Sequence, residues 1–296
     1  MRILVTGARG MLGRDLCPVL RSCHDVVGID QEEADVADLK AMCDLVADVQ
    51  PDCVLHAAEF RDVDRTESCP RLARRVNAIG TLHVAVAANQ VNAHFAYIST
   101  SYVFDGAKDS PYVEADPPNP INVYGDTKYA GERAVTSLFD NHFIFRTGWL
   151  FAPHGMNFVN TVIRMAQGKC WLEAVTDRIG TPTYSLDLAH AINAALVAGV
   201  PGVYHVANSG SCSRFEFASE ILKQMGICAP LRPATSDPCR QPARRPAYSA
   251  LSSDRLRREV GYAMRPWREA LGDCLARRES QAAESIPQLA PAVSAR

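Results

Sequence analysis

The stretch Ile3-Leu4-Val5-Thr6-Gly7-Ala8-Arg9-Gly10-Met11-Leu12-Gly13 decides the fold of this chain. It predicts a buried strand that passes through a glycine turn into a helix. Gly7 allows the tight turn, Gly10 lets the backbone approach a pyrophosphate, and Gly13 lets the helix lie close to the strand. The free N–H groups and the positive dipole end at the helix start favour a dianionic pyrophosphate. We therefore expect a βαβ unit that binds a dinucleotide; the alternative is a glycine turn without a ligand.

Composition sets the broad class of protein. The chain has 296 residues, which suits one large α/β domain or two interleaved ones. Its net charge of −2 argues against a nucleic-acid-binding or membrane-surface protein. No apolar run is long enough to span a bilayer, and Met1-Arg2-Ile3 leads into the first strand without the apolar segment of a signal peptide. We expect a cytosolic protein with no nucleic-acid or membrane partner.

Cysteine and histidine spacing predicts no metal site. The ten cysteines include no C-x-x-C pair, and the eight histidines show no H-x-x-x-H spacing. In a reducing compartment, scattered cysteines are mostly small buried apolar side chains.

Strand and helix patterns alternate through the first half of the chain. The expected strands are Arg2–Thr6, Asp25–Ile29, Asp52–His56, Phe95–Ser99 and His142–Thr147. The expected helices are Met11–Arg21, Leu39–Val49, Cys69–Gln90 and Tyr124–Phe139. Apolar strands separated by amphipathic helices indicate a parallel sheet covered on both faces. With right-handed crossovers this is an α/β, doubly wound (Rossmann) sheet, whose ligand lies at the carboxyl ends of the strands.

The second half of the chain is less regular. It predicts helices at Asn157–Gln167, Ser185–Val197, Ser213–Met225 and Pro266–Ala276, with strands at Trp171–Val175 and Val203–Val206. The prolines between Pro230 and Pro246 exclude a long helix, so an ordered loop or a mobile flap is expected there.

These patterns suggest a division into parts. We expect residues 1–152 to form the dinucleotide-binding domain, with its sheet completed by residues 185–206. Residues 153–280 then form a smaller, interleaved α/β part that binds the substrate. Residues 281–296, rich in Ala, Ser, Pro and Gln, predict a disordered tail.

The sequence leaves the choice between NAD and NADP open. Asp30 ends the second strand, where an acid favours the ribose hydroxyls of NAD and repels a 2′-phosphate. Arg9 stands immediately before Gly10, where its guanidinium can bind that phosphate or remain a solvated loop charge. Asp35 and Val36 are candidates to flank the adenine. We expect NADPH or NADH, with use of both.

Tyr124 and Lys128 form the candidate catalytic pair. They are four residues apart, so on a helix they share a face. An ammonium beside a phenol favours the phenolate, which draws the tyrosine pKa toward neutral pH. The turn Ser99-Thr100-Ser101-Tyr102 follows a predicted strand, so its hydroxyls should lie at the carboxyl end of the sheet, where they can bind a substrate carbonyl. Ordinary Ser/Thr capping is the alternative.

Several longer segments resemble the extended short-chain dehydrogenase/reductases over about residues 1–277. Besides the glycine turn, these segments are Ser99-Thr100-Ser101-Tyr102-Val103-Phe104-Asp105-Gly106, Pro118-Asn119-Pro120-Ile121-Asn122-Val123-Tyr124-Gly125, Arg146-Thr147-Gly148-Trp149, Gly180-Thr181-Pro182-Thr183, Asp187-Leu188-Ala189 and Arg245-Pro246-Ala247-Tyr248-Ser249. Within this family the chain looks like the reductases of dTDP-linked 6-deoxy-4-ketohexoses. The resemblance implies NAD(P)H-dependent reduction of the C4 keto group of such a nucleotide sugar.

The resemblance also implies roles for individual residues. It makes Thr100, Tyr124 and Lys128 the catalytic trio, with Lys128 also holding the nicotinamide ribose. Together with the glycine turn, it gives the expected cofactor residues Gly7, Arg9, Gly10, Met11, Leu12, Gly13, Asp30, Asp35, Val36, Ala57, Ala58, Asn77, Tyr124 and Lys128. The expected substrate residues are Thr100, Ser101, Tyr102, Trp149, Arg244 and Arg245.

Three places depart from the family pattern. Ser101 stands where the family has aspartate, Gly148 where it has serine, and Glu59-Phe60-Arg61 where it has Ala-Tyr-Thr. All three should border the cofactor or the sugar, so the identity of the sugar is open. Glu59 and Arg61 can form an internal ion pair or contact a ligand.

An arginine-rich segment is the candidate diphosphate site. Nine arginines lie between Arg232 and Arg268, against three acids. A solvated basic face accounts for most of them. A nucleoside-diphosphate sugar carries two phosphate charges, which arginine forks bind well, and the resemblance puts the loop of Arg244 and Arg245 near them. We expect one of these two arginines to contact the diphosphate.

Two other functions stay open. One is a nucleotide-sugar epimerase of the same superfamily. The other is a non-catalytic, NAD(P)-binding regulatory subunit, because the regulatory subunit of methionine adenosyltransferase resembles these reductases. A dehydratase is disfavoured, since related dehydratases place an Asp-Glu pair where this chain has Ser101-Tyr102. A homodimer is one option for the assembly.

Overall fold

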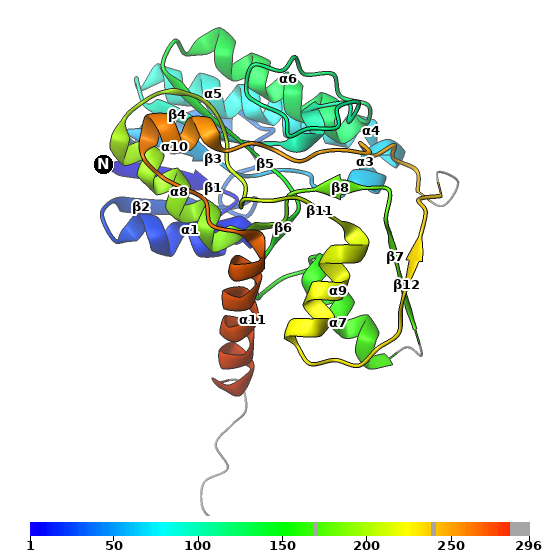
Figure 1. The fold of residues 1–296 in the computed structure, drawn as a ribbon. Coiled ribbons are helices and arrows are strands. Elements are labelled where there is room, and N and C mark those ends of the chain that lie inside the picture. Colours follow the sequence, from blue (N-terminus) through cyan, green and yellow to red (C-terminus); the bar gives the residue numbers. More distant parts are fainter. Residues whose placement is uncertain (169–170, 238–240, 285–296) are drawn as a thin grey trace, which may run out of the picture.

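A six-stranded parallel sheet forms the centre of the larger half of the molecule (Figure 1). The computed structural model describes residues 1–168, 171–237 and 241–284. The strand order is β10-β5-β4-β3-β1-β2. The bounds are β1 (Arg2–Thr6), β2 (Asp25–Ile29), β3 (Cys53–His56), β4 (His94–Thr100), β5 (His142–Thr147) and β10 (Gly202–His205). The winding changes direction between β1 and β3, so the carboxyl ends of these strands frame the crevice in which ligands of such sheets bind.

Helices cover both faces of the sheet, because alternate strand residues point to opposite sides. On one face, Val5, Leu55 and Phe145 pack against α1 (Met11–Arg21) and α8 (Ser185–Ala198). On the other face, Leu4, Val54 and neighbouring apolar residues pack against three helices. These are α2 (Leu39–Val49), α5 (Thr81–Gln90) and α6 (Val123–Leu138). The parallel, doubly wound sheet expected from the sequence is confirmed.

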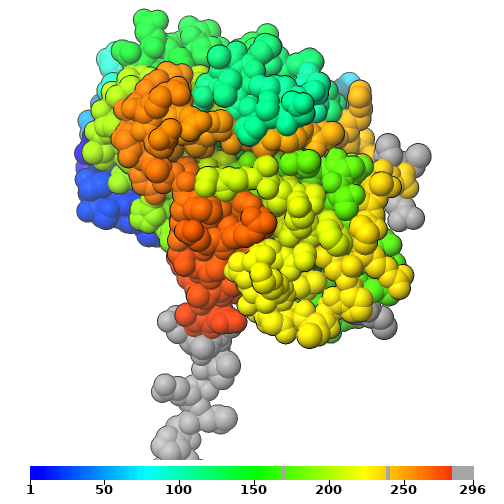
Figure 2. Space-filling model, in the orientation of Figure 1, coloured from blue at the N-terminus to red at the C-terminus, as the bar shows by residue number. Residues whose placement is uncertain are grey.

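A second apolar cluster lies below the sheet in Figure 1. Phe151, Phe217 and Trp267 are fully buried in it. Figure 2 shows α9 and α11, which both contribute to this cluster, side by side on the surface. The remaining elements are α3 (Val63–Ser68), α4 (Pro70–Arg74), the π-helical turn Arg75–Gly80, the 3₁₀ turn Ser101–Val103, β6 (Leu150–Phe151), α7 (Phe158–Gly168), β7 (Leu172–Val175), β8 (Ile179–Gly180), β9 (Thr183–Tyr184), β11 (Cys212–Ser213), α9 (Arg214–Gln224), β12 (Leu231–Ala234), α10 (Asp254–Val260) and α11 (Trp267–Glu284).

Three expectations about elements are wrong. The single helix expected at Cys69–Gln90 is instead α4, a π-helical turn and α5, with an unexpected helix α3 before them. Cys69 takes a non-helical backbone because it precedes Pro70, which begins α4. The proline-rich stretch from Pro230 contains the strand β12, which is an edge strand paired only with β7 and therefore tolerates Pro233.

The third error concerns the tail expected to be disordered from residue 281. Helix α11 continues through Glu284, because the sequence after Ala276 is rich in good helix formers. Arg277 also pairs with the buried Asp15 of α1 at 2.7 Å, which ties this helix to the sheet half. Residues 285–296 lie outside the described part of the chain. The division of the chain at residue 152 stays a prediction.

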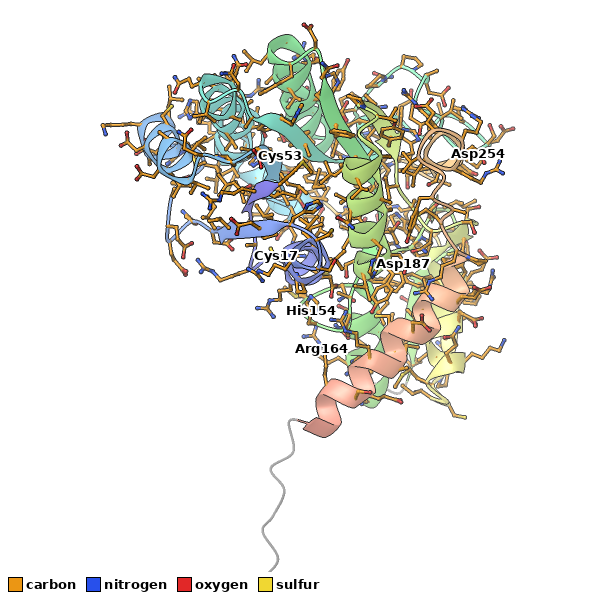
Figure 3. All side chains as sticks on the ribbon, turned by 90° about the vertical axis from the view of Figure 1, so that its left-hand side faces the viewer. Cys17, Cys53, His154, Arg164, Asp187 and Asp254 are labelled. Atoms are coloured by element: carbon orange, nitrogen blue, oxygen red, sulfur yellow. The ribbon has the colours of Figure 1, made fainter. Side chains whose placement is uncertain are left out.

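Cysteines and acids are dispersed through the fold. Figure 3 labels Cys17 on α1, Cys53 on β3 and Asp187 on α8, each separate from the others. In the described ranges, no group of three or more His, Cys, Asp or Glu is arranged to hold a metal ion. Cys170 and Cys239 fall outside those ranges. No helix within them is long and apolar enough to cross a membrane.

Candidate functional site

The glycine turn between β1 and α1 leaves no room for side chains. Gly7 has a φ of +74°, and a Cβ there would lie 2.8 Å from the backbone nitrogen of Ala58. A Cβ on Gly13 would overlap the carbonyl oxygens of Gly7 and Ala8. Gly10 is the N-cap of α1 and no side chain caps this helix, so its first N–H groups face the cleft uncovered. The turn therefore fits a pyrophosphate.

A cleft of about 640 Å³ opens above this turn. It runs along the carboxyl ends of β1, β2 and β3, as the strand order requires. Many of the expected cofactor residues line it, namely Gly7, Arg9, Gly10, Met11, Leu12, Gly13, Asp30, Asp35, Val36, Ala57 and Ala58.

Asn77 lies behind this cleft and does not line it. Its amide is fully buried and clamps the backbone of Phe60, accepting from the N–H at 2.7 Å and donating to the carbonyl at 3.1 Å. It also donates to the hydroxyl of Thr127 on α6. Asn77 therefore fixes the loop that follows β3 against α6.

Arg9 and Asp30 interact with each other. The backbone N–H of Arg9 donates to the Asp30 carboxylate at 2.6 Å, and the guanidinium lies 3.6 Å from it. The same guanidinium forms ion pairs with Glu32 and with Glu33, 2.7 Å away. These contacts, the Glu33 hydrogen bond first, raise the pKa of Arg9. The arginine expected to bind a 2′-phosphate is thus already paired with three carboxylates.

A second, smaller cleft of about 220 Å³ adjoins the first. Met11, Glu59, Arg61, Ile98 and Leu150 line both clefts, so the two are continuous. The smaller cleft is also lined by the expected residues Thr100, Ser101, Tyr102, Tyr124 and Trp149.

Tyr124 and Lys128 lie one turn apart near the start of α6, whose N-cap Asn122 accepts from the N–H of Gly125 at 2.7 Å. The Lys128 ammonium is buried and donates to the carbonyl oxygen of Ile98 at 2.7 Å. It lies 4.4 Å from the ring centre of Tyr97. These contacts point the lysine toward the end of β4, where Thr100 accepts from the N–H of Tyr102.

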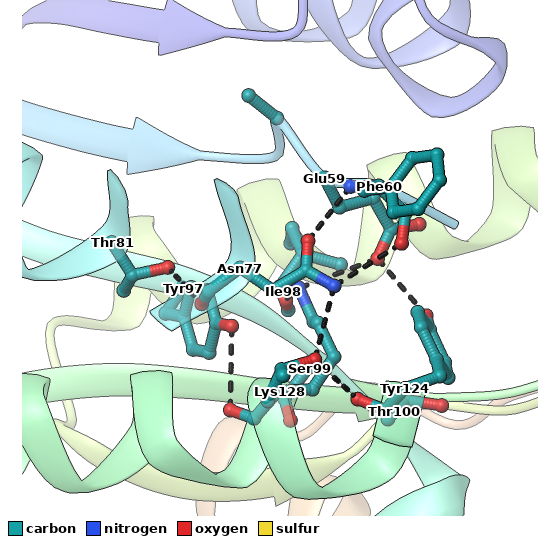
Figure 4. Close-up of polar contacts among 12 residues, drawn as sticks. Glu59, Phe60, Asn77, Thr81, Tyr97, Ile98, Ser99, Thr100, Tyr124 and Lys128 are labelled. Atoms are coloured by element: carbon teal, nitrogen blue, oxygen red, sulfur yellow. Dashed lines mark hydrogen bonds and ion pairs between the residues drawn. The ribbon is translucent and has the colours of Figure 1, made fainter. Parts of the chain in front are cut away.

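Glu59 contacts both members of the candidate catalytic pair, Tyr124 and Lys128. The Tyr124 hydroxyl donates to Glu59 Oε2 at 2.9 Å, and the Lys128 ammonium lies 3.3 Å from the same oxygen (Figure 4). Burial, followed by the charge and hydrogen bond of Glu59, raises the pKa of Tyr124 well above its ordinary value. The expectation that Lys128 draws this pKa toward neutral pH is wrong for this arrangement, because burial and then the Glu59 carboxylate both favour the protonated phenol. The ion pair considered for Glu59 and Arg61 is absent among the described contacts; Arg61 instead donates to the carbonyl oxygen of Met156 at 3.5 Å.

The departures at Ser101 and Gly148 touch one another. A Cβ on Gly148 would lie 2.6 Å from the Ser101 hydroxyl oxygen. This hydroxyl is buried and has no hydrogen-bond partner in the described part of the protein. A side chain at residue 148 would therefore crowd the side chain of Ser101. The two small residues therefore accommodate each other.

Three arginines from distant segments gather beside Tyr102. Arg245 pairs with Asp64 at 2.6 Å, and both Arg245 and Arg178 donate to Gln241. Arg214, the first residue of α9, stacks on Trp149 with its guanidinium carbon 3.5 Å from the ring centre, and it lines the smaller cleft. Burial first, with the charges of the other two arginines contributing, lowers the pKa of Arg214 to about 10.

The two arginines expected at the diphosphate differ. Arg245 belongs to this cluster, whereas the side chain of Arg244 is exposed and only its carbonyl oxygen is used, by Asn122. Sequence reasoning missed Arg178 and Arg214. The one available signal was their position, since Arg178 precedes the matching segment Gly180–Thr183 and Arg214 is the second residue of the predicted helix Ser213–Met225.

Comparisons with known proteins identify the family of this chain. A family model described as the RmlD substrate binding domain matches residues 1–280. The dTDP-4-dehydrorhamnose reductase of Burkholderia thailandensis is 38% identical over 93% of this chain and 98% of its own length. The spore coat polysaccharide biosynthesis protein SpsK of Bacillus subtilis is 38% identical over 94% of this chain and 98% of its own.

Solved structures give the same result. The dTDP-4-dehydrorhamnose reductase of Bacillus anthracis, determined in complex with NADP, has a TM-score of 0.90 and 38% identity over 93% of this chain and 99% of its own. The Clostridium acetobutylicum orthologue has a TM-score of 0.92 and 36% identity over 94% of this chain and 100% of its own. The chain therefore belongs to the family of the RmlD substrate binding domain, within the extended short-chain dehydrogenase/reductases.

Proposed function

We propose that the protein reduces the C4 keto group of a dTDP-linked 6-deoxy-4-ketohexose with NAD(P)H, as the name of its relatives, dTDP-4-dehydrorhamnose reductase, suggests. The observation that carries the proposal is the continuity of the two clefts. The glycine turn borders one cleft, Thr100 and Tyr124 border the other, and five residues line both.

The residues of the larger cleft fit a dinucleotide. The uncovered N–H groups at the start of α1 would hold the pyrophosphate, and Asp30 the adenine ribose. Lys128 is buried and is not among the described residues that line either cleft, and its role at the nicotinamide ribose is taken from the family resemblance. When bound, NAD(P)H supplies the hydride.

The residues of the smaller cleft perform the proton chemistry. Tyr124 donates its phenolic proton to the C4 oxygen as charge develops there, and Thr100 orients the carbonyl. The buried Lys128 ammonium stabilises the phenolate that remains. Trp149 and Tyr102 enclose the sugar. Ser101 and Gly148 both line this end of the cleft, and we propose that the family departures there help to set which sugar fits.

The arginine cluster is the proposed diphosphate site. Arg178, Arg214 and Arg245 come from three separate segments and face one another around Tyr102, although like charges repel. Their closest carboxylate contact is Asp64 on Arg245. A doubly charged diphosphate compensates such a surplus, and its oxygens suit guanidinium forks. Arg214, which has no carboxylate partner in the described residues, is the central contact.

The test is turnover by the purified protein with NADPH and a dTDP-4-keto-6-deoxyhexose. Oxidation of NADPH with formation of the C4 alcohol supports the proposal. Epimerised sugar without net oxidation identifies an epimerase, and cofactor binding without turnover identifies a regulatory subunit. A homodimer and a cytosolic location stay predictions from the sequence, which sedimentation and cell fractionation can check.

A further inference from the structure

Glu59 lies where the two clefts meet. It follows β3, and the next residue, Phe60, is held through both its backbone N–H and its carbonyl by the buried amide of Asn77. The loop is therefore fixed, and Glu59 projects toward α6 (Figure 4). The extended family has alanine at this place, so the family's usual chemistry does not require this carboxylate.

The Glu59 carboxylate is in direct contact with the atom that gives up the proton. Its Oε2 accepts the phenolic hydrogen of Tyr124 at 2.9 Å and lies 3.3 Å from the Lys128 ammonium. Among the contacts of the described residues, no side chain donates to its other oxygen, Oε1, and Arg61 donates to the carbonyl oxygen of Met156 instead. One oxygen thus contacts the candidate catalytic pair, and the Glu59 side chain as a whole is partly exposed.

The groups around the Tyr124 hydroxyl differ in their access to solvent. Tyr124 is 8% exposed, Thr100 is 6% exposed and Lys128 is 1% exposed. The Glu59 side chain is 23% exposed. The other ionisable groups near this site are Tyr97 of β4, Tyr102 after β4, Arg61 after β3 and Arg214 of α9. Tyr97 is fully buried, and the two guanidinium groups stay protonated at neutral pH, so neither acts as the acid that reprotonates Tyr124.

We propose that Glu59 relays a proton from solvent to Tyr124 after each reduction; the proposal rests on the proposed function. During reduction, the Tyr124 O–H bond breaks as its proton goes to the C4 oxygen, and a phenolate remains. The Glu59 carboxylate beside it then takes a proton from hydronium in the solvent, which leaves water and makes Glu59 a carboxylic acid. The Glu59 O–H bond next breaks as a new O–H bond forms on Tyr124, and Glu59 is a carboxylate again.

The direction of this transfer is favourable. A phenolate is a much stronger base than a carboxylate, so a proton passes from the carboxylic acid to the phenolate. The arrangement in the structure, a phenol that donates to a carboxylate, is the state after this transfer. The enzyme at rest therefore holds one proton on Tyr124, ready for one reduction.

The test is a rapid-mixing measurement with the substitution Glu59→Gln. Glutamine keeps the length and an acceptor oxygen but cannot carry the proton. With NADPH and a dTDP-4-keto-6-deoxyhexose, we expect a burst of one NADPH oxidised per active site at close to the wild-type rate. A steady phase about tenfold slower, or slower still, should follow. Glu173→Gln, an exposed carboxylate on β7, is the matched control and should behave as wild type.

A second variant separates proton transfer from structure. In Glu59→Ala, formate added to the buffer should accelerate the steady phase, because a small carboxylic acid replaces the missing group. Equal slowing of the first and later turnovers, or no slowing of either, would overturn the relay, as would Glu59→Ala that formate does not accelerate. Wild-type protein that oxidises no NADPH would overturn the proposed function and the relay with it.

Discussion

The two ends of the binding surface differ in how many carboxylates surround their arginines. At the dinucleotide end, one guanidinium, that of Arg9, meets the carboxylates of Asp30, Glu32 and Glu33. At the substrate end, Arg178, Arg214 and Arg245 share one close carboxylate, Asp64. At the dinucleotide end the arginine charge is balanced by carboxylates of the protein itself, whereas at the substrate end the arginines have a surplus of positive charge that a diphosphate can neutralise. The difference teaches that an arginine near a nucleotide site is informative only when its carboxylate partners are known.

The largest effect is expected between these two ends, at Tyr124, the proposed proton donor. Tyr124→Phe removes the phenolic proton and keeps the ring against Tyr102. We expect turnover to fall by two or more orders of magnitude, the scale of general acid catalysis. Dinucleotide and sugar-nucleotide affinities, measured by calorimetry, should stay close to wild type, since both charged ends are intact. Turnover near the wild-type value would remove Tyr124 from the mechanism.

Arg214→Ala tests the uncompensated end. We expect the Michaelis constant for the sugar nucleotide to rise by a factor that corresponds to about 1.5–3 kcal/mol, the scale of a charge-assisted hydrogen bond. The constant for the dinucleotide should not change. The loss should shrink as salt rises, because the contact is ionic and partly exposed.

Arg244→Ala is the matched control for this measurement. Its side chain is exposed, it neighbours Arg245, and it contributes only a carbonyl oxygen to Asn122. We expect both Michaelis constants to stay at wild-type values. If Arg244→Ala raised the sugar constant and Arg214→Ala did not, the cluster would not be the diphosphate site.

Beneath the dinucleotide end, burial keeps the side chain of His56 uncharged. Burial first, and then the charge of Lys128, lowers the pKa of His56 to about 3. The neutral ring interacts with Thr6 at 2.7 Å and Thr81 at 3.1 Å. Between about pH 3 and 6.5, His56 binds a proton in the unfolded chain but not in the folded protein. The free energy of unfolding therefore falls as the pH drops below about 6.5.

The expected loss from His56 is at most about 1.4 kcal/mol per pH unit in that window. Denaturant unfolding at neutral pH and at about pH 5 measures it. In His56→Asn the slope should decrease but not vanish, because His205 is buried with a pKa also lowered to about 3. An unchanged slope would mean that His56 becomes charged without unfolding.

Local patterns determined most of what the sequence predicted correctly. The bounds of β1, β2, β5, α1 and α2 were as expected, because strand alternation and helix periodicity are properties of neighbouring residues. The positions of the glycine turn and of the turn at the carboxyl end of β4 also followed from these local patterns. The predicted helix before Gln90 failed at Cys69, where one proline changes the backbone of the residue before it.

What the sequence did not give depends on contacts between distant segments. Arg214 joins the cluster because the start of α9 brings its guanidinium onto Trp149, which follows β5. Asp64 meets Arg245 across more than half of the chain. Glu59 stood out as a departure from the family, but its partners Tyr124 and Lys128 lie on α6 and could not be identified from spacing.

The smallest expected effect tests the compensated end, through cofactor preference. Asp30→Asn removes one of the three charges around Arg9 and keeps an oxygen that accepts from the Arg9 N–H. We expect the ratio of kcat/KM for NADPH to that for NADH to rise about tenfold, equivalent to about 1.4 kcal/mol. As a control, Asp44→Asn replaces an exposed carboxylate that pairs with Lys40 on α2, and it should leave the ratio unchanged.

The substitution Asp30→Asn in an Arg9→Ala background then separates two causes of the change in cofactor preference. If Asp30 acts by repelling the 2′-phosphate, the tenfold rise persists without Arg9. If Asp30 acts by pairing with Arg9, the rise in the ratio disappears in this background, and Arg9 is the residue that binds the 2′-phosphate. No change in the ratio in either background would show that charge compensation at this end does not govern the choice of dinucleotide.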